Sequence, residues 1–232
     1  MGRLATTTRP VYDSRQVPAH GDKVGPVVFL INEAPGPSEA LSGIPSFGHQ
    51  GANIFHALRN AGISWVVAHQ KFVWPVSVAS QPTVRHLQKA AFLESRAKHM
   101  TCTNAFPCWP KPNQLSYGFC SPRNEDVDAV ENINRIRGEL RSTHRAILIC
   151  GIYAYLACVG KPLDHPSKRE STRLTTTEVL ALNRRLNSNL ERGWYMGHTR
   201  RWSMRGNHVA ETLRQLAEFL GWPVEEGLPI TS

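Results

Sequence analysis

The stretch that decides the fold is Pro26-Val27-Val28-Phe29-Leu30-Ile31, followed at once by Asn32-Glu33-Ala34-Pro35-Gly36. A continuous apolar run of this length is typical of a parallel strand that is buried on both faces. The second run reads as a loop, which its proline stiffens. We therefore expect Glu33 at the carboxyl edge of a sheet, which is where open α/β sheets bind their ligands.

Outward from this strand, further strands and helices alternate along the chain. Three other apolar segments predict strands, at 102–106, 146–151 and 194–198. Helical spacing of apolar residues predicts helices over 53–60, 81–100, 125–140, 152–160, 177–191 and 207–220. We expect a loop without helix at 32–51, a strand-like segment at 65–78 and a polar excursion at 161–177. The pattern predicts an α/β fold with a central four-stranded, mainly parallel sheet and helices on both faces.

Size and charge narrow the class of protein. The chain has 232 residues, of which 41% are hydrophobic. This length suits one well-filled domain, which we place at 26–232 behind an N-terminal arm at 1–25. The formal net charge of +9 favours an acidic polymer such as nucleic acid as the partner.

The cysteines and the apolar runs favour a reduced, cytoplasmic monomer. Five cysteines are present, and none of them forms a Cys-x-x-Cys pair, so we expect no zinc site. We also expect no signal peptide and no membrane partner, because no apolar stretch approaches the length of a span.

The loop after the first strand carries a motif. Glu33-Ala34-Pro35-Gly36 is followed by Gly43-x-Pro45 and Gly48-x-x-Gly51. This run resembles the first motif of the uracil-DNA glycosylase superfamily. It is most similar to the thermostable iron–sulfur branch, with its Gly-Glu-Ala-Pro-Gly, acidic spacer and Gly-Arg-Pro-Phe-Val-Gly-x-x-Gly.

The resemblance implies that Glu33 is the catalytic carboxylate, which activates water against the glycosidic carbon. The best-known members have an aspartate one place later, where this chain has Ala34. We place Asn32 and Ala34 beside the base. The stacking Phe of the family aligns with Ser46, and we assign that role to the next residue, Phe47.

A second motif follows the second strand. Thr103-Asn104-Ala105-Phe106-Pro107-Cys108 continues through Pro110 to Asn113, and is similar to Thr-Asn-Val-Val-Lys-Cys-Arg-Pro-Pro-x-Asn of the family. The resemblance implies that Asn104 reads the edge of uracil. One side-chain amide offers both a donor and an acceptor, which matches O4 and N3–H of uracil.

The third motif presents a choice between two histidines. His165-Pro166-Ser167 is the literal signature of the superfamily, but it follows the third strand too soon. The histidine of the family follows the fourth strand and precedes the last helix, which is the position of His198. We therefore predict that His198 stabilises the departing uracil anion, and that His165 does not.

The segment behind His198 is basic and aromatic. We predict that it contacts DNA, with Arg201 or Trp202 filling the gap left by a flipped base. The predicted contact residues are Arg200, Arg201, Trp202, Ser203 and Arg205.

The cysteine pattern of this chain differs from that of the iron–sulfur branch. Cys108 and Cys120 match two ligands of its cluster, but the N-terminal pair is missing, and four thiolates are needed. We expect no cluster, no other metal and no organic cofactor.

The sequence thus predicts a monofunctional enzyme that flips uracil out of double- or single-stranded DNA and leaves an abasic site. No lysine stands at a matched motif position, so no Schiff-base step is implied. Two alternatives remain open. In the first, the same fold acts on another base, which is hypoxanthine, xanthine or an oxidised pyrimidine. In the second, the protein binds damaged or single-stranded DNA without catalysis. An unrelated nucleotide-binding enzyme lacks support, because no phosphate-binding glycine motif is present.

Overall fold

Strand β1 (Val28–Asn32) is an interior strand of a five-stranded sheet in the computed structural model, which describes residues 17–67, 82–106, 129–160, 171–199, 202 and 206–225. The sheet has the order β2-β1-β3-β5-β4. The other strands are β2 (Met100–Asn104), β3 (Ala146–Cys150), β4 (Thr172–Arg173) and β5 (Arg192–Met196). The pairs β1–β2, β1–β3 and β3–β5 are parallel.

The predicted single-domain α/β fold is confirmed, but the predicted four-stranded sheet is not exact. A fifth strand, β4, pairs antiparallel with β5, with Thr172 opposite Tyr195. It lies in the segment that we expected to be a polar excursion. Two residues, one partly buried and one exposed, carry no apolar alternation, so only the pairing with β5 makes them a strand.

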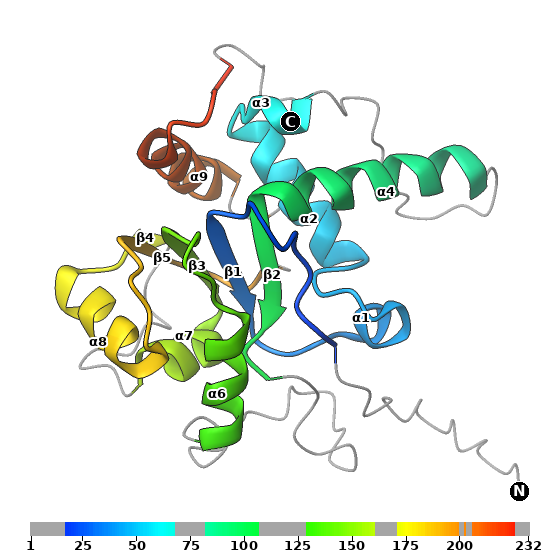
Figure 1. Ribbon diagram of the computed structural model, residues 1–232. Coiled ribbons are helices and arrows are strands. Elements are labelled where there is room, and N and C mark those ends of the chain that lie inside the picture. The colour runs from blue at the N-terminus through cyan, green and yellow to red at the C-terminus, as the bar shows by residue number, and fades with distance from the viewer. Residues whose placement is uncertain are drawn as a thin grey trace, which may run out of the picture.

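Helices cover both faces of the sheet (Figure 1). On one face lie α2 (His49–Asn60), α3 (Ser64–Val67), α4 (Pro82–His99) and α9 (Gly206–Leu220). On the other lie α6 (Val130–Glu139), α7 (Ile152–Val159) and α8 (Thr176–Leu186). None of the helices in the described ranges has the length and hydropathy that a membrane span requires.

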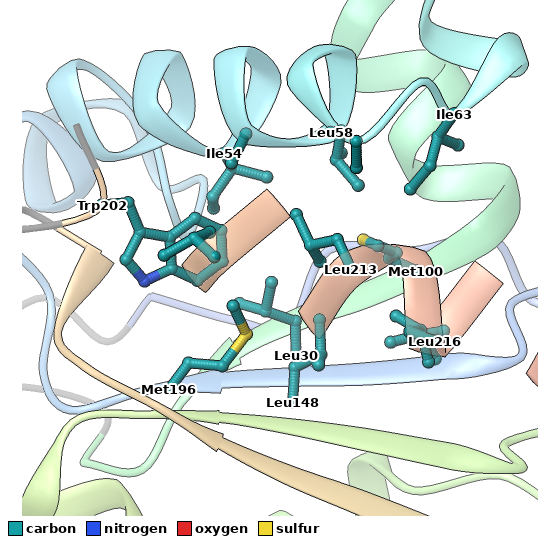
Figure 2. Packing of buried hydrophobic residues seen from close by; sticks show 14 of the residues in the cluster. Leu30, Ile54, Leu58, Ile63, Met100, Leu148, Met196, Trp202, Leu213 and Leu216 are labelled. Carbon is teal, nitrogen blue, oxygen red and sulfur yellow. The ribbon is translucent and has the colours of Figure 1, made fainter. Parts of the chain in front are cut away.

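Two hydrophobic cores separate the sheet from its two helical layers. Val28 and Leu30 face the core under α2 and α9, and Phe29 and Ile31 face the core under α7 and α8. Figure 2 shows the first of these cores, where Leu30 and Leu148 meet Leu213 of α9. Because both faces of β1 are buried, its sequence is continuously apolar rather than alternating.

Two local predictions are wrong. The expected loop at 32–51 contains a six-residue helix, α1 (Pro37–Ser42), which starts after Gly36 and stops at Gly43 with φ 67°. The glycines and the proline of this segment therefore mark the ends of a short helix. The segment at 65–78 was expected to be strand-like, but its described beginning belongs to helix α3, and 68–78 lies outside the described residues.

Part of the predicted N-terminal arm packs on the domain. Val17 is buried, and His20 exchanges two backbone hydrogen bonds of 2.8 Å with Cys102 of β2. This bridge covers part of the outer edge of β2, and so occupies backbone groups that an edge strand otherwise leaves unpaired. Residues 1–16 lie outside the described residues.

Candidate active site

Glu33 and His198 meet at the carboxyl edge of the sheet. Glu33 follows β1 and His198 follows β5, and the two strands flank β3. Nε2 of His198 lies 3.8 Å from Oε2 of Glu33, and the two side chains are 20% and 14% exposed. The contact becomes an ion pair when the imidazole carries a proton. Two residues that are 165 positions apart in the sequence therefore form one partly open acid–base pair.

The amino end of α7 supports the carboxylate of Glu33. The backbone N–H of Tyr153 donates to Oε1 of Glu33 at 3.2 Å. Gly151, which joins β3 to α7, has φ +99°, and a Cβ built on it would overlap the Glu33 carboxyl group. A carboxylate at a helix amino end is favoured by the helix dipole. Glycine at 151 thus lets the carboxylate approach α7 closely.

Asn32 and Asn104 lie side by side on the opposite face of the same edge. They are register partners in the β1–β2 ladder, and both are almost fully buried. Nδ2 of Asn32 donates to Oγ of Ser46 at 2.5 Å, and Nδ2 of Asn104 faces Oε1 of Glu39 at 3.5 Å. Their Oδ1 atoms are buried and have no hydrogen-bond partner. Each amide therefore holds an unused acceptor.

Glu39, on α1, is a residue of this site that the sequence analysis missed. Its side chain is 1% exposed. The backbone N–H groups of Gly36 and Ser46 donate to its Oε2 and Oε1 at 2.6 and 2.5 Å. Burial raises the pKa of Glu39, and the two backbone hydrogen bonds oppose that rise. The available signal was the three-residue spacing from Gly36, which is the spacing of a capping box.

Arg96, on α4, completes the burial of this loop and was also missed. Its side chain is fully buried. Nη2 donates to the carbonyl of Pro45 at 3.0 Å, and Nη1 donates to that of Ser46 at 3.1 Å. The guanidinium also acts against the rise in the pKa of Glu39. The sequence showed only a basic helix here, where an arginine usually faces solvent.

Phe47 follows directly and is partly buried. Nζ of Lys89, on α4, lies 2.9 Å from the centroid of its ring. Burial lowers the pKa of Lys89. The predicted stacking residue thus has a cation on one face of its ring. Ala34, which we placed beside the base, is partly buried against the core under α7.

Arg135, on α6, holds the backbone at the end of β2. Its Nη2 donates to the carbonyls of Asn104 and Ala105 at 2.7 and 2.9 Å. Its Nη1 pairs with Oε1 of Glu139 at 2.6 Å. This arginine satisfies strand-end carbonyls beside Asn104, and nothing in its local sequence marks it.

Trp202, which we predicted to contact DNA, is a core residue in this structure. The indole is 2% exposed and belongs to the core beside α2 and α9, where Figure 2 shows it near Ile54 and Met196. Its Nε1 donates to the carbonyl of Gly197 at 2.8 Å. A core side chain with its one donor satisfied is not available to enter a duplex.

Several predicted residues lie outside the described part of the chain. They are Arg200, Arg201, Ser203, Arg205, His165, Cys108 and Cys120. Within the described ranges, no three His, Cys, Asp or Glu side chains are grouped so that they could hold a metal ion.

Comparison with known proteins finds no protein-family model that matches this chain and no matching curated protein. Its function is therefore inferred from the residues at the carboxyl edge of the sheet.

Proposed function

We propose that this protein is a monofunctional DNA glycosylase that flips out uracil and hydrolyses its N-glycosidic bond, leaving an abasic site. The observation that carries the proposal is the pairing of Glu33 with His198 at 3.8 Å, on ends of β1 and β5. Asn104 ends the neighbouring strand β2, so a base-reading amide belongs to the same edge.

The pair suits the two charges that develop as the glycosidic bond breaks. The bonding electrons leave with N1 of uracil and spread to O2, to which Nε2–H of His198 donates. The sugar gains positive character at C1′, which the Glu33 carboxylate stabilises. Water then attacks C1′ and its proton passes to Glu33. The leaving anion is delocalised over the ring, so the reaction needs neither a metal ion nor an organic cofactor.

The pair of Glu33 and His198 has to open for this reaction. Two groups 3.8 Å apart leave no room for a sugar and a base between them. Glu33 is held by the Tyr153 amide of α7, while His198 lies on the segment between β5 and α9. Entry of the base therefore displaces His198 and leaves Glu33 in place.

The remaining features fit a nucleic-acid substrate. A net charge of +9 favours association with a polyanion. Nζ of Lys89 lies over one face of the Phe47 ring, and the proposal assigns the other face to stacking on the flipped base. Stacking of this kind offsets part of the cost of removing a base from the helix.

A base-release assay tests the proposal. We expect the wild type to release uracil from a uracil-containing oligonucleotide, and His198→Ala and Glu33→Gln to lower the single-turnover rate by about 100-fold or more. His208→Ala, at an exposed histidine on α9, is the matched control and keeps the wild-type rate. Gel-shift binding measured beside it shows that the variants still bind DNA.

The same assay separates the alternatives. Oligonucleotides with hypoxanthine, xanthine and an oxidised pyrimidine are run alongside. Release of one of these without any uracil release contradicts the proposed substrate. Tight DNA binding without release of any base identifies a non-catalytic binder.

A further inference from the structure

The carboxylate of Glu39 gathers three separate segments of the chain. It accepts the backbone N–H of Gly36 and of Ser46, and it faces the side-chain amide of Asn104. A charged group with 1% exposure is costly unless hydrogen bonds replace its water. These contacts tie the loop before Phe47 to the end of β2.

Arg96 holds the same loop from the other side. Through the carbonyls of Pro45 and Ser46 it fixes the peptide whose N–H Glu39 binds. Ser46 itself has φ 54°, a left-handed conformation that side-chain-bearing residues seldom adopt without support. Two buried, oppositely charged groups therefore set the path of the backbone into Phe47.

Glu39 also decides which way the Asn104 amide points. Both of its oxygens already accept a backbone N–H, so the group that faces Asn104 is an acceptor. Nδ2 of Asn104 is turned toward it at 3.5 Å. The contact is long, but the reversed amide would place Oδ1 against carboxylate oxygens, which repel it. Oδ1 is left as the acceptor without a partner.

Asn32 adds a second unused acceptor in the same place. Its Nδ2 is taken by Oγ of Ser46, and its Oδ1 is also unpaired. Because Asn32 and Asn104 are aligned partners on neighbouring strands, their side chains lie on the same face. Two buried, unpaired acceptors side by side can take hydrogen bonds from donors on a ligand.

We propose that Glu39 is a positioning residue that fixes the Asn104 amide with Oδ1 free, so that the site selects bases with a ring N–H at their Watson–Crick edge. This inference rests on the proposed function for the identity of the ligand. Uracil, hypoxanthine and xanthine have such an N–H beside a carbonyl, which takes the second hydrogen of Nδ2. Cytosine and adenine present a bare ring nitrogen there, which repels Oδ1.

Binding of free bases tests the inference without catalysis. We measure the affinities of free uracil and free cytosine by NMR titration for the wild type, Glu39→Gln and Glu94→Gln. Glu94 is the matched control because its side chain is 70% exposed. The wild type and the control are expected to prefer uracil by about tenfold or more, which corresponds to one hydrogen-bond mismatch. In Glu39→Gln the new amide can present either a donor or an acceptor to Asn104. Both orientations of the Asn104 amide are then allowed, and the ratio of uracil affinity to cytosine affinity falls toward one.

Hydrogen exchange gives a readout of the loop itself. In the wild type, the amides of Gly36 and Ser46 exchange slowly, and Glu39→Gln speeds their exchange because one carboxylate oxygen is lost. If Glu39→Gln does not fold, a wild type that binds uracil and cytosine equally, or that exchanges these two amides rapidly, still overturns the inference.

The outcomes separate this inference from the glycosylase proposal. An unchanged uracil preference in Glu39→Gln overturns the inference, as does a wild type that binds both bases equally or neither. Preference for free uracil without release from DNA supports the inference and contradicts the proposed reaction. Release of uracil from DNA, with the uracil preference unchanged in Glu39→Gln, supports the proposed reaction and contradicts the inference about Glu39.

Discussion

At the scale of single residues, Asn32 and Glu33 show how one step along the chain divides the candidate site. Asn32 reaches Ser46 between α1 and α2, while Glu33 reaches the amino end of α7 on the opposite face. Successive side chains of a strand alternate between the faces of the sheet. The amide of Asn32, which we placed beside the base, and the carboxylate that would handle water therefore come from adjacent residues.

Gly151 is a residue at which we expect a small substitution to lower both stability and activity. In Gly151→Ala we expect a loss of about 1–3 kcal/mol in the free energy of unfolding, because alanine is strained at φ +99°. The new methyl group also displaces the Glu33 carboxyl group, so uracil release falls in the folded variant too. Urea unfolding and the release assay measure the two effects.

Gly138→Ala is the matched control for that substitution. Gly138 lies in α6, and a Cβ there meets no atom within 4 Å. It is expected to leave activity unchanged and to stabilise the protein slightly, since alanine favours helix. Equal behaviour of the two variants contradicts the role given to Gly151.

At the scale of elements, α6 is bound to the end of β2 through polar side chains, chiefly that of Arg135. Arg135 donates to two strand-end carbonyls, to Oγ1 of Thr103 at 3.4 Å and to Glu139. Asn132 of the same helix donates to the carbonyl of Ala105 at 2.7 Å. The helix thus replaces the water that those carbonyls would otherwise need.

Removing this link is expected to weaken the protein. Arg135→Met keeps the length of the stem but removes a charged donor from the carbonyls of Asn104 and Ala105 and from Oε1 of Glu139, at a cost of about 1–3 kcal/mol in unfolding free energy. Arg137→Met on the same helix is the control, since the hydrogen bonds of Arg137 are exposed. Urea unfolding measures the loss of unfolding free energy in both variants. Equal losses in the two contradict the role given to Arg135.

Elements were predictable where burial is regular. The four parallel strands and the longer helices follow from apolar runs and helical spacing, and they lie within a few residues of the predicted positions. The short elements α1 and β4 were missed. One is bounded by glycines, and the other exists only because β5 lies beside it.

At the scale of the whole molecule, burial between three layers lowers the proton affinity of several imidazoles. Burial lowers the pKa of His20, His56 and His99. For His144, burial and the charge of Arg141 lower the pKa from 6.5 to about 4. Nδ1 of that ring accepts the N–H of Arg141 at 2.8 Å, so Nε2 donates to Thr101 at 2.8 Å.

The sign of the pH dependence follows from these values. An unfolded imidazole gains its proton near pH 6.5, and the folded His144 does so only near pH 4. Its contribution to stability is therefore complete above pH 6.5 and is lost as the pH falls from 6.5 to 4. We expect His144→Gln to flatten the dependence of unfolding free energy on pH within that window, measured by urea unfolding.

His208→Gln is the control for this experiment, because that ring is exposed. Its pH dependence is expected to match that of the wild type. A His144→Gln variant that retains the wild-type slope between pH 6.5 and 4 would show that other groups cause the acid sensitivity.

By itself, the sequence determined the α/β class, the four parallel strands and three residues at their carboxyl ends: Glu33, Asn104 and His198. Apolar runs and local motifs carry this information, because a buried strand and the loop behind it are contiguous in the chain. Only the tertiary structure decided that Glu33 meets His198, that Glu39 and Arg96 are buried at this edge, and that Arg135 binds the backbone carbonyls there. A charged side chain is read from sequence as exposed, and its burial depends on partners that folding brings from other elements. Trp202, which was predicted to contact DNA, is likewise buried by partners that folding brings from other elements.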